Sequence, residues 1–189
     1  MFFKYFLAFF SLFVRLSKQE GRCPVFCHCD IEIGFVKCAD ELLIDIPAFL
    51  PDNTTQLSLP GNKIVEINFQ MLQKTGVDYK LETLNLMDNK IESIVPGSFK
   101  HMNMLKQLYL LNNSLSVLKS NNFFGLKNLE ELNLSRNKIS ILEKGAFSGL
   151  LKLKTLELWG NKLYSIGSLS FEQLGSLSIL SLGEKFVFL

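Results

Sequence analysis

The residues of this chain with the greatest capacity for chemistry are four cysteines, Cys23, Cys27, Cys29 and Cys38, which lie together in CPVFCHCDIEIGFVKC. Such a cluster could coordinate zinc through its thiolates, with His28 as an extra ligand, or form two disulfide bonds. Zinc sites usually contain two separated cysteine pairs, whereas Cys27 and Cys29 would point to opposite faces of an extended segment. The spacing therefore favours disulfides, and four cysteines allow three pairings.

The N-terminal segment MFFKYFLAFFSLFVRLSKQEG supports the same interpretation. Lys4 precedes a run at residues 5–14 that is apolar apart from Ser11, which fits the apolar region of a secretory signal peptide and is shorter than the about 20 residues of a membrane span. Arg15 is not typical of a cleavage site, so an uncleaved hydrophobic helix or anchor is the alternative. We predict a signal peptide at residues 1–21, which would place the cysteines in an oxidising, extracellular compartment.

Residues that could carry out catalysis are few. The two histidines, His28 and His101, accompany no nucleophile in a recognisable spacing, and GxGxxG, P-loop, HExxH and GxSxG motifs are absent from the sequence. The acidic residues are scattered, so no carboxylate pair suggests acid–base catalysis. We predict that the protein is not an enzyme and that it uses no cofactor, no metal and no small-molecule substrate.

The charge balance argues against polyanionic partners. The chain has 20 basic and 18 acidic residues, and removal of residues 1–21 would leave equal numbers of the two. No long run of like charge remains. This balance indicates that neither nucleic acid nor a heparin-like polyanion is the main partner.

A period of 24 residues organises the rest of the chain. LEELNLSRNKISILEKGAFSGL at 129–150 returns as LKTLELWGNKLYSIGSLSFEQL at 153–174. In the shared pattern LxxLxLxxN, positions 4 and 6 would share the inward face of a strand, whereas positions 3, 5 and 7 would point outward. The units begin at Thr54, in a degenerate copy, and then at Leu81, Leu105, Leu129, Leu153 and Leu177.

Two further columns of residues keep the same phase. Asparagine occupies position 9, where its amide can satisfy backbone groups freed as the chain turns, and stacked repeats would join these amides into a ladder. Phenylalanine recurs at position 19 and predicts an aromatic spine behind the strands. The members are Asn62, Asn89, Asn113, Asn137 and Asn161, and Phe99, Phe123, Phe147 and Phe171. Because one repeat cannot bury its apolar edge alone, the units must stack.

These repeats resemble extracellular leucine-rich repeats over residues 23 to about 187. CPVFCHC followed by Val36-Lys37-Cys38 is similar to the cysteine-rich N-terminal cap of that family, and NTTQLSLPGNKI is similar to the beginning of its first repeat. Slit-like guidance proteins, Toll-like receptors, hormone-receptor ectodomains and small leucine-rich proteoglycans share these features. The resemblance implies an α/β repeat solenoid: a horseshoe with a parallel β-sheet on its concave face and irregular or short helical convex returns. It also implies disulfides between Cys23 and Cys29 and between Cys27 and Cys38.

The predicted organisation has four parts. A signal peptide at 1–21 precedes a cysteine-rich cap at 22–53, five leucine-rich repeats at 54–176 and a partial, uncapped sixth repeat at 177–189. Family members usually close with a cysteine-containing cap, which LSILSLGEKFVFL does not resemble. We expect either the N-terminal part of a longer protein, attached to a membrane only through a missing C-terminal region, or a short protein that self-associates through its uncapped repeat.

The outward strand positions supply candidate binding residues. Met87, Tyr109, Leu111 and Trp159 form the predicted partner-binding patch, because tryptophan and tyrosine are enriched in binding hot spots. The alternative is that they are isolated exposed apolar residues without a binding role.

Three sequons predict N-glycosylation, at Asn53, Asn112 and Asn133. Asn112 and Asn133 are expected on the strand face, where glycans would cover the middle of the concave surface. The Asn133 sequon also arises from the repeat pattern alone.

The sequence therefore predicts a secreted protein, or the ectodomain of a cell-surface protein, that recognises a protein ligand on its concave face. The alternative is a structural protein of the extracellular matrix that binds matrix components or self-associates.

Overall fold

A computed structural model describes residues 22–183 of the chain. The predicted signal peptide and residues 184–189 of the sixth repeat lie outside the described residues. None of the helices in the described part of the chain is long and apolar enough to cross a membrane.

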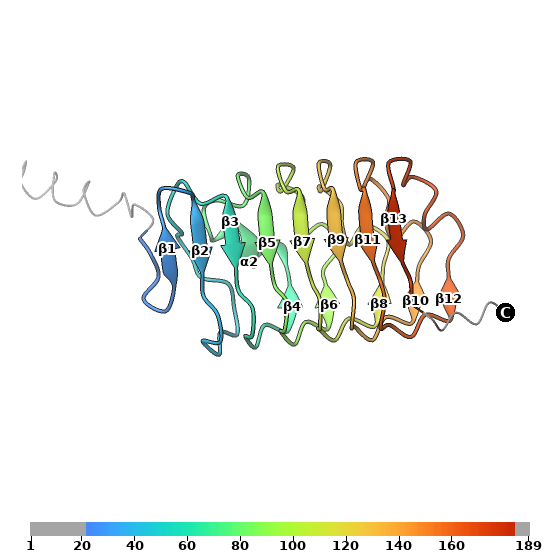
Figure 1. The fold of residues 1–189 in the computed structure, drawn as a ribbon, viewed down its shortest axis with the longest axis horizontal. Helices are drawn as coiled ribbons and strands as arrows, with labels where there is room; N and C mark the ends of the chain where they lie inside the picture. The colour runs from blue at the N-terminus through green and yellow to red at the C-terminus, as the bar shows by residue number, and fades with distance from the viewer. Residues whose placement is uncertain (1–21, 184–189) are drawn as a thin grey trace, which may run out of the picture.

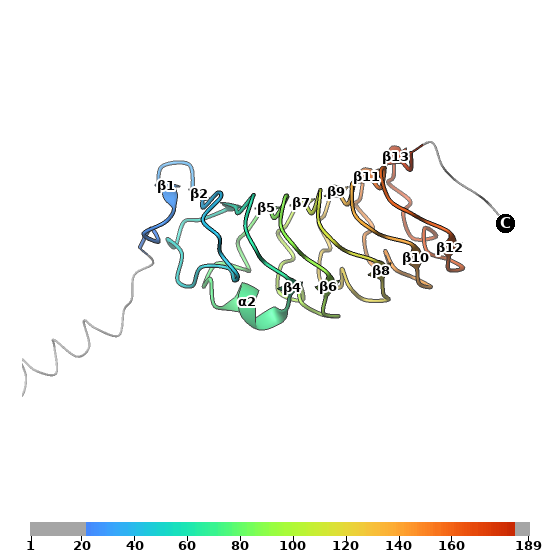
Figure 2. The same cartoon turned by 90° about the horizontal axis from the view of Figure 1, so that it is seen from below.

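An eight-stranded sheet runs along the molecule (Figure 1). Its strands, in spatial order, are β1 (His28–Asp30), β2 (Phe35–Lys37), β3 (Gln56–Ser58), β5 (Thr83–Asn85), β7 (Gln107–Tyr109), β9 (Glu131–Asn133), β11 (Thr155–Glu157) and β13 (Ile179–Ser181). The first two strands are antiparallel, and every later pair is parallel with equivalent repeat positions side by side. Each repeat therefore contributes one short strand, and the row of strands is gently curved (Figure 2). We call the outward side of this sheet the concave face.

The opposite side of the solenoid carries shorter elements. Five two-residue strands, β4 (Glu66–Ile67), β6 (Ser93–Ile94), β8 (Val117–Leu118), β10 (Ile141–Leu142) and β12 (Ser165–Ile166), form a pair and a three-stranded sheet. The helix α2 (Phe69–Gln73) lies in the repeat that is longer than the others by three residues. Asn68 caps it, because its side-chain oxygen accepts a hydrogen bond of 3.0 Å from the Met71 amide. The convex returns are thus irregular or short and helical, as expected.

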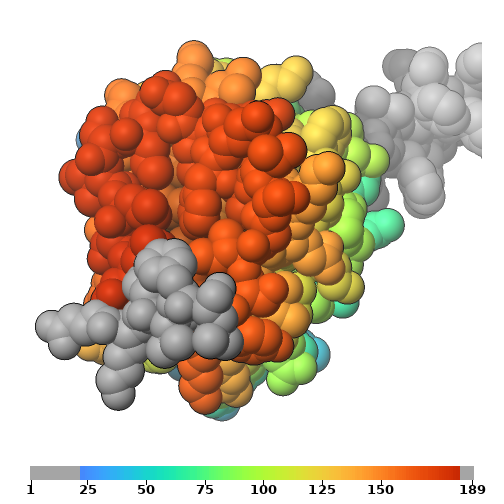
Figure 3. All heavy atoms as spheres, turned by 90° about the vertical axis from the view of Figure 1, so that its right-hand side faces the viewer, coloured from blue at the N-terminus to red at the C-terminus, as the bar shows by residue number. Residues whose placement is uncertain are grey.

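The core consists of the inward leucine columns. Leu57, Leu84, Leu108, Leu132 and Leu156 at position 4 have no exposed surface. Burial of each such side chain stabilises the fold by about 1.5–3 kcal/mol relative to exposure. The last described repeat forms one end of the molecule (Figure 3), and its Leu180 is 41% exposed. Each repeat therefore depends on its neighbours on both sides for full burial.

The aromatic spine is confirmed. Phe99, Phe123, Phe147 and Phe171 stack in sequence, with ring centroids 6.4, 6.0 and 5.6 Å apart. The first three rings are fully buried, and Phe171 packs against the same core. A single phenylalanine per repeat therefore fills the space between the two sides of the solenoid.

The asparagine ladder is also confirmed. Asn137 donates from its amide nitrogen to the carbonyls of Leu110 at 2.9 Å and Leu134 at 3.0 Å. Its oxygen accepts from the Leu115 amide at 3.0 Å. Asn89, Asn113 and Asn161 make the equivalent bonds in their own repeats.

The N-terminal cap covers one edge of the parallel sheet. Disulfides join Cys23 to Cys29 and Cys27 to Cys38, the pairing that the resemblance implies. The hairpin of β1 and β2 extends the sheet beyond β3, and the Asn62 amide donates to the Cys38 carbonyl at 2.8 Å. The first rung of the ladder thus joins the cap to the repeats. Within residues 22–183, no group of three or more His, Cys, Asp or Glu residues is placed to hold a metal ion.

Candidate functional site

The concave face presents three straight rows of side chains. Because the parallel strands pair equivalent positions, residues at position 3 lie side by side about 4.8 Å apart, as do those at position 5. Position 7 follows the strands, where backbone hydrogen bonds to its carbonyls from the preceding repeat continue the alignment. The central rows are Thr83, Gln107, Glu131 and Thr155; Asn85, Tyr109, Asn133 and Glu157; and Met87, Leu111, Ser135 and Trp159. All of them except the fully buried Ser135 retain some exposed surface, and the leucine columns complete the core without them.

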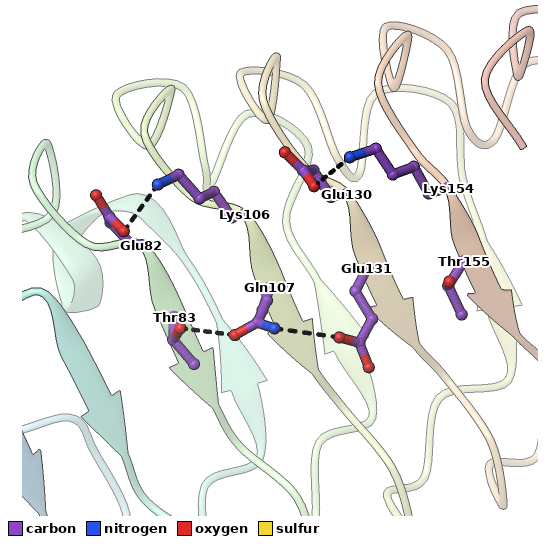
Figure 4. Close-up of a pocket in the computed structure, with 8 residues that line it drawn as sticks. All are labelled: Glu82, Thr83, Lys106, Gln107, Glu130, Glu131, Lys154 and Thr155. Atoms are coloured by element: carbon purple, nitrogen blue, oxygen red, sulfur yellow. Dashed lines mark hydrogen bonds and ion pairs between the residues drawn. The ribbon is translucent and has the colours of Figure 1, made fainter.

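A shallow groove of about 360 Å³ crosses the beginning of strands β5 to β11. Figure 4 shows its lining: the position-3 row on the sheet, and charged residues at position 2 above it. The charged residues form two ion pairs, Lys106 with Glu82 at 2.9 Å and Lys154 with Glu130 at 2.7 Å. The hydrogen bond from Lys154 and its positive charge lower the pKa of Glu130 below its ordinary value. The acids of this rim are therefore neutralised by their neighbours in the next repeat.

The position-3 row is linked by hydrogen bonds (Figure 4). The Thr83 hydroxyl donates to Gln107 Oε1 at 3.0 Å, and Gln107 Nε2 donates to Glu131 Oε2 at 3.3 Å. The Tyr109 hydroxyl, from the next row, donates to the same carboxylate oxygen at 2.9 Å. These bonds fix the direction in which the Glu131 carboxylate faces.

Tyr109 is held in its protonated form. Burial, the hydrogen bond to Glu131 and the negative charge of that carboxylate together raise the pKa of Tyr109 to about 12. The phenol therefore remains a hydrogen-bond donor throughout the physiological pH range.

The four residues of the predicted patch share the concave face but are not all contiguous. Met87 and Leu111 lie side by side at position 7 and are half-buried, and Tyr109 precedes Leu111 in the same repeat. Trp159 is 37% exposed, and the guanidinium of Arg136 lies 4.7 Å from its ring centroid. Ser135 separates Leu111 from Trp159 in the row and is fully buried.

The sequence predicted that Gln107 and Glu131, at position 3, face outward on the sheet, but they were not included in the predicted partner-binding patch, and the hydrogen bonds that Glu131 accepts from Gln107 and Tyr109 were not anticipated. A usable signal was present, because position 3 holds Thr, Gln and Glu in three successive repeats, and such side chains can donate to or accept from one another. The pattern did not indicate that Tyr109 would join this row, since that depends on its side-chain direction.

The three sequon asparagines occupy different surroundings. Asn53 is exposed in the loop before β3, and Asn133 lies in β9 on the concave face. The expectation that Asn112 lies on the strand face is wrong: it follows β7 in a turn with φ of 54°, and its amide donates to Asp88 at 2.7 Å. The physical reason is that position 8 takes the left-handed conformation in successive repeats, as Asp88 and Arg136 do with φ of 56° and 52°.

Comparison with known proteins gives consistent matches. The sequence profile of the leucine rich repeat matches residues 52–115 and 105–163, which is more than half of the chain. The TLR13-ssRNA13 complex is a structural match with a TM-score of 0.68 and 30% identity, covering 81% of this chain and 21% of that chain.

Three relatives show similar identity over shorter segments. Trophoblast glycoprotein of Macaca fascicularis is 29% identical over 46% of this chain, Podocan of Mus musculus is 36% identical over 46%, and Reticulon-4 receptor-like 2 of Homo sapiens is 34% identical over 51%. The matched segments cover 21%, 14% and 22% of those relatives. This chain therefore spans only a small part of their length.

Proposed function

The chain belongs to the leucine-rich repeat family, and from that premise we propose that it acts in the extracellular space as a recognition module for a protein ligand. The ligand binds the concave face, over strands β5 to β11. Relatives named as a glycoprotein and as a receptor-like protein support a protein-interaction role rather than an enzymatic one.

The extracellular location is supported by the cap. Its four cysteines are all paired in disulfides, and such bonds persist in oxidising compartments and are rare in the cytosol. A signal peptide at residues 1–21 would deliver the chain to that compartment, where Asn53, Asn112 and Asn133 could carry glycans. A glycan at Asn133 would occupy the middle of the concave face and restrict ligand contacts to its flanks.

One observation supports the choice of the concave face as the binding surface. Tyr109 lies in β7 and Trp159 lies two residues after β11, and neither belongs to the buried core of the solenoid. Aromatic side chains of this kind supply a large contact area at a low entropic cost and dominate many interfaces. Met87 and Leu111 extend the same surface with apolar contacts.

We expect no RNA ligand, although the structural match is by its name a complex with single-stranded RNA. Within the concave-sheet strands β3, β5, β7, β9, β11 and β13, the charged residues are Glu131 and Glu157. Two carboxylates on the sheet would repel a phosphate backbone, which requires lysine or arginine.

A binding screen against purified ectodomains and secreted proteins tests this function. A true ligand should bind at least about tenfold more weakly to Trp159→Ala and to Tyr109→Ala, because truncation of a hot-spot residue removes most of its contact energy. Phe124→Ala is the matched control, since Phe124 is an aromatic residue that is 55% exposed outside the sheet. Ligands that respond to Phe124→Ala and ignore both concave variants would place the site elsewhere. Retention of the expressed chain inside cells would contradict the extracellular location.

A further inference from the structure

The acids of the concave side fall into two classes. Glu82 and Glu130, on the rim, are each paired with a lysine of the next repeat. Glu131 and Glu157, on the sheet itself, form no ion pair within residues 22–183. Glu130 and Glu131 are adjacent in the sequence, but Glu130 pairs with Lys154 whereas Glu131 has no basic partner among the described residues.

The two unpaired carboxylates are neighbours. Glu131 lies opposite Thr155 in the register of β9 and β11, and Glu157 follows Thr155 by two residues on the same face. The two residues are therefore diagonal neighbours about 7–8 Å apart, and a cation placed between their carboxylates would be attracted by both.

Glu131 is already oriented for such a contact. Its Oε2 atom accepts hydrogen bonds from Gln107 and Tyr109, which hold the carboxylate in place. Its Oε1 atom has no hydrogen-bond partner among the described residues. A preorganised acceptor with an open oxygen loses little conformational freedom when a donor binds.

Three basic residues on the concave side contact other groups. Lys106 and Lys154 pair with the rim acids, and Arg136 lies over the Trp159 ring. Lys37, in β2, is separated from β9 by three intervening strands of the sheet. The chain itself therefore supplies no cation to Glu131 and Glu157 within the described residues.

From this charge pattern we propose that the concave face recognises a protein segment through a lysine or arginine side chain, which enters between Glu131 and Glu157. Tyr109 lies in β7, beside β9, and Trp159 follows Glu157 by two residues; both contact the apolar or aliphatic part of the same segment. This inference rests on the proposed function and adds the chemical class of the ligand to it. Arginine fits best, because its planar fork can donate to both carboxylates at once.

A random peptide library, displayed on phage and selected on the immobilised full chain, provides the probe. Selected peptides should be enriched in arginine and lysine. They should bind the Glu131→Gln, Glu157→Gln double variant at least about tenfold more weakly than the wild type, because charge-assisted hydrogen bonds are lost. Glu172→Gln, the matched control, should change the dissociation constant less than about twofold, since Glu172 is an exposed acid outside the concave sheet.

A second arm does not depend on the folding of the variants. Replacement of the basic residue of a selected peptide by glutamine should weaken its binding to the wild type about tenfold, and should cause little further loss with the double variant. Raised salt should weaken the unmodified peptide most.

The outcomes separate this inference from the function on which it rests. Peptides that need Tyr109 and Trp159 but show no preference for basic residues, or bind the double variant normally, would overturn the inference and leave the proposed function standing. Peptides that bind independently of both aromatic residues would overturn the concave site and this inference with it.

Discussion

Asn137 shows how one buried side chain closes each turn of the solenoid. Where the chain leaves β9, peptide groups lose their strand partners, and the Asn137 amide bonds three carbonyls and one peptide N–H in their place. These partners come from its own repeat and the preceding one. An amide suits this role because it donates and accepts without carrying a charge into the core.

Asn137→Ala should lower the free energy of unfolding by about 2–4 kcal/mol, because it leaves buried peptide groups without partners. Urea denaturation followed by circular dichroism measures the loss. Asn128→Ala is the control: its amide makes two exposed hydrogen bonds, donating to the Asn103 carbonyl at 2.7 Å and accepting from Lys152 Nζ at 2.7 Å, and their removal should cost less than about 1 kcal/mol. Equal losses in the two variants would contradict the role given to the ladder.

Tyr109 should give the concave face a measurable titration. Its pKa is raised to about 12 in the folded chain, so the phenol binds its proton more tightly there than in the unfolded chain, whose tyrosines titrate near about 10. The resulting stability is fully present below about pH 10 and is lost as the pH rises toward about 12.

Glu131→Gln should lower the pKa of Tyr109 from about 12, because it removes the negative charge and weakens the hydrogen bond that favour the neutral phenol. Burial is the larger cause, so the value should stay above the ordinary 10.0. Absorbance at the tyrosinate band during a pH titration measures the shift. Tyr109→Phe should remove this late step entirely, which identifies it. Superimposable titrations of wild type and Glu131→Gln would disprove the contact.

The packing of the segments that connect the strands depends on close contacts between backbones as well as on the buried apolar side chains. Gly125 adopts φ of 107°, and a Cβ atom there would meet the Phe99 carbonyl oxygen and would lie 2.6 Å from Lys100 Cα. Gly149 occupies the same position of the next repeat with φ of 87°, and its Cβ would meet nothing within 4 Å. The two glycines therefore share a backbone conformation and differ in the space around them.

Gly125→Ala should destabilise the chain by more than about 3 kcal/mol for two reasons. Neighbouring backbone atoms must move to make room for the new Cβ atom, and alanine is strained at this positive φ. Gly149→Ala should cost about 1–2 kcal/mol from conformational strain alone. Thermal denaturation of both variants tests the difference. A similar melting temperature for the two would mean that the stacked returns can shift apart at little cost.

At this scale the sequence predicted what the repeats share. The leucine, asparagine and phenylalanine columns indicated the strands, the ladder and the spine, because each column makes the same contact in successive units. It did not locate α2, since the three extra residues of that repeat break the phase that the columns supply. The network from Gln107 and Tyr109 to Glu131 escaped prediction for another reason: it depends on side-chain rotamers across strands, which repeat positions do not determine.

Across the whole molecule, stability is transmitted only between neighbours. The sheet order runs from β1 to β13 with each strand bonded only to the adjacent ones, so no contact joins the cap directly to the central repeats. In such a solenoid, total stability approximates a sum of repeat and interface contributions, and damage at one end need not unfold the rest. The two disulfides allow this to be tested, because both lie in the cap but differ in their burial.

Removal of the Cys27–Cys38 bridge by serine substitution should cost about 2–4 kcal/mol within the cap. It closes a longer loop than Cys23–Cys29, with a sequence separation of 11 against 6, and Cys38 has no exposed surface whereas Cys23 is exposed. Serine at Cys23 and Cys29 should therefore cost less, by at least about 0.5 kcal/mol on loop entropy alone.

Hydrogen exchange should show which strands lose stability when the Cys27–Cys38 bridge is removed. In the variant without Cys27–Cys38, amides of β2 and β3 should exchange faster, because the cap opens from the edge of the sheet, while those of β9 should keep their protection. The Cys23, Cys29 variant provides the comparison at the same end of the molecule. A uniform loss of protection from β2 to β11 would instead mean that the solenoid unfolds as one unit. In that case the concave face would depend on an intact cap, even though β9, at the centre of the proposed binding surface, is separated from β2 by three strands.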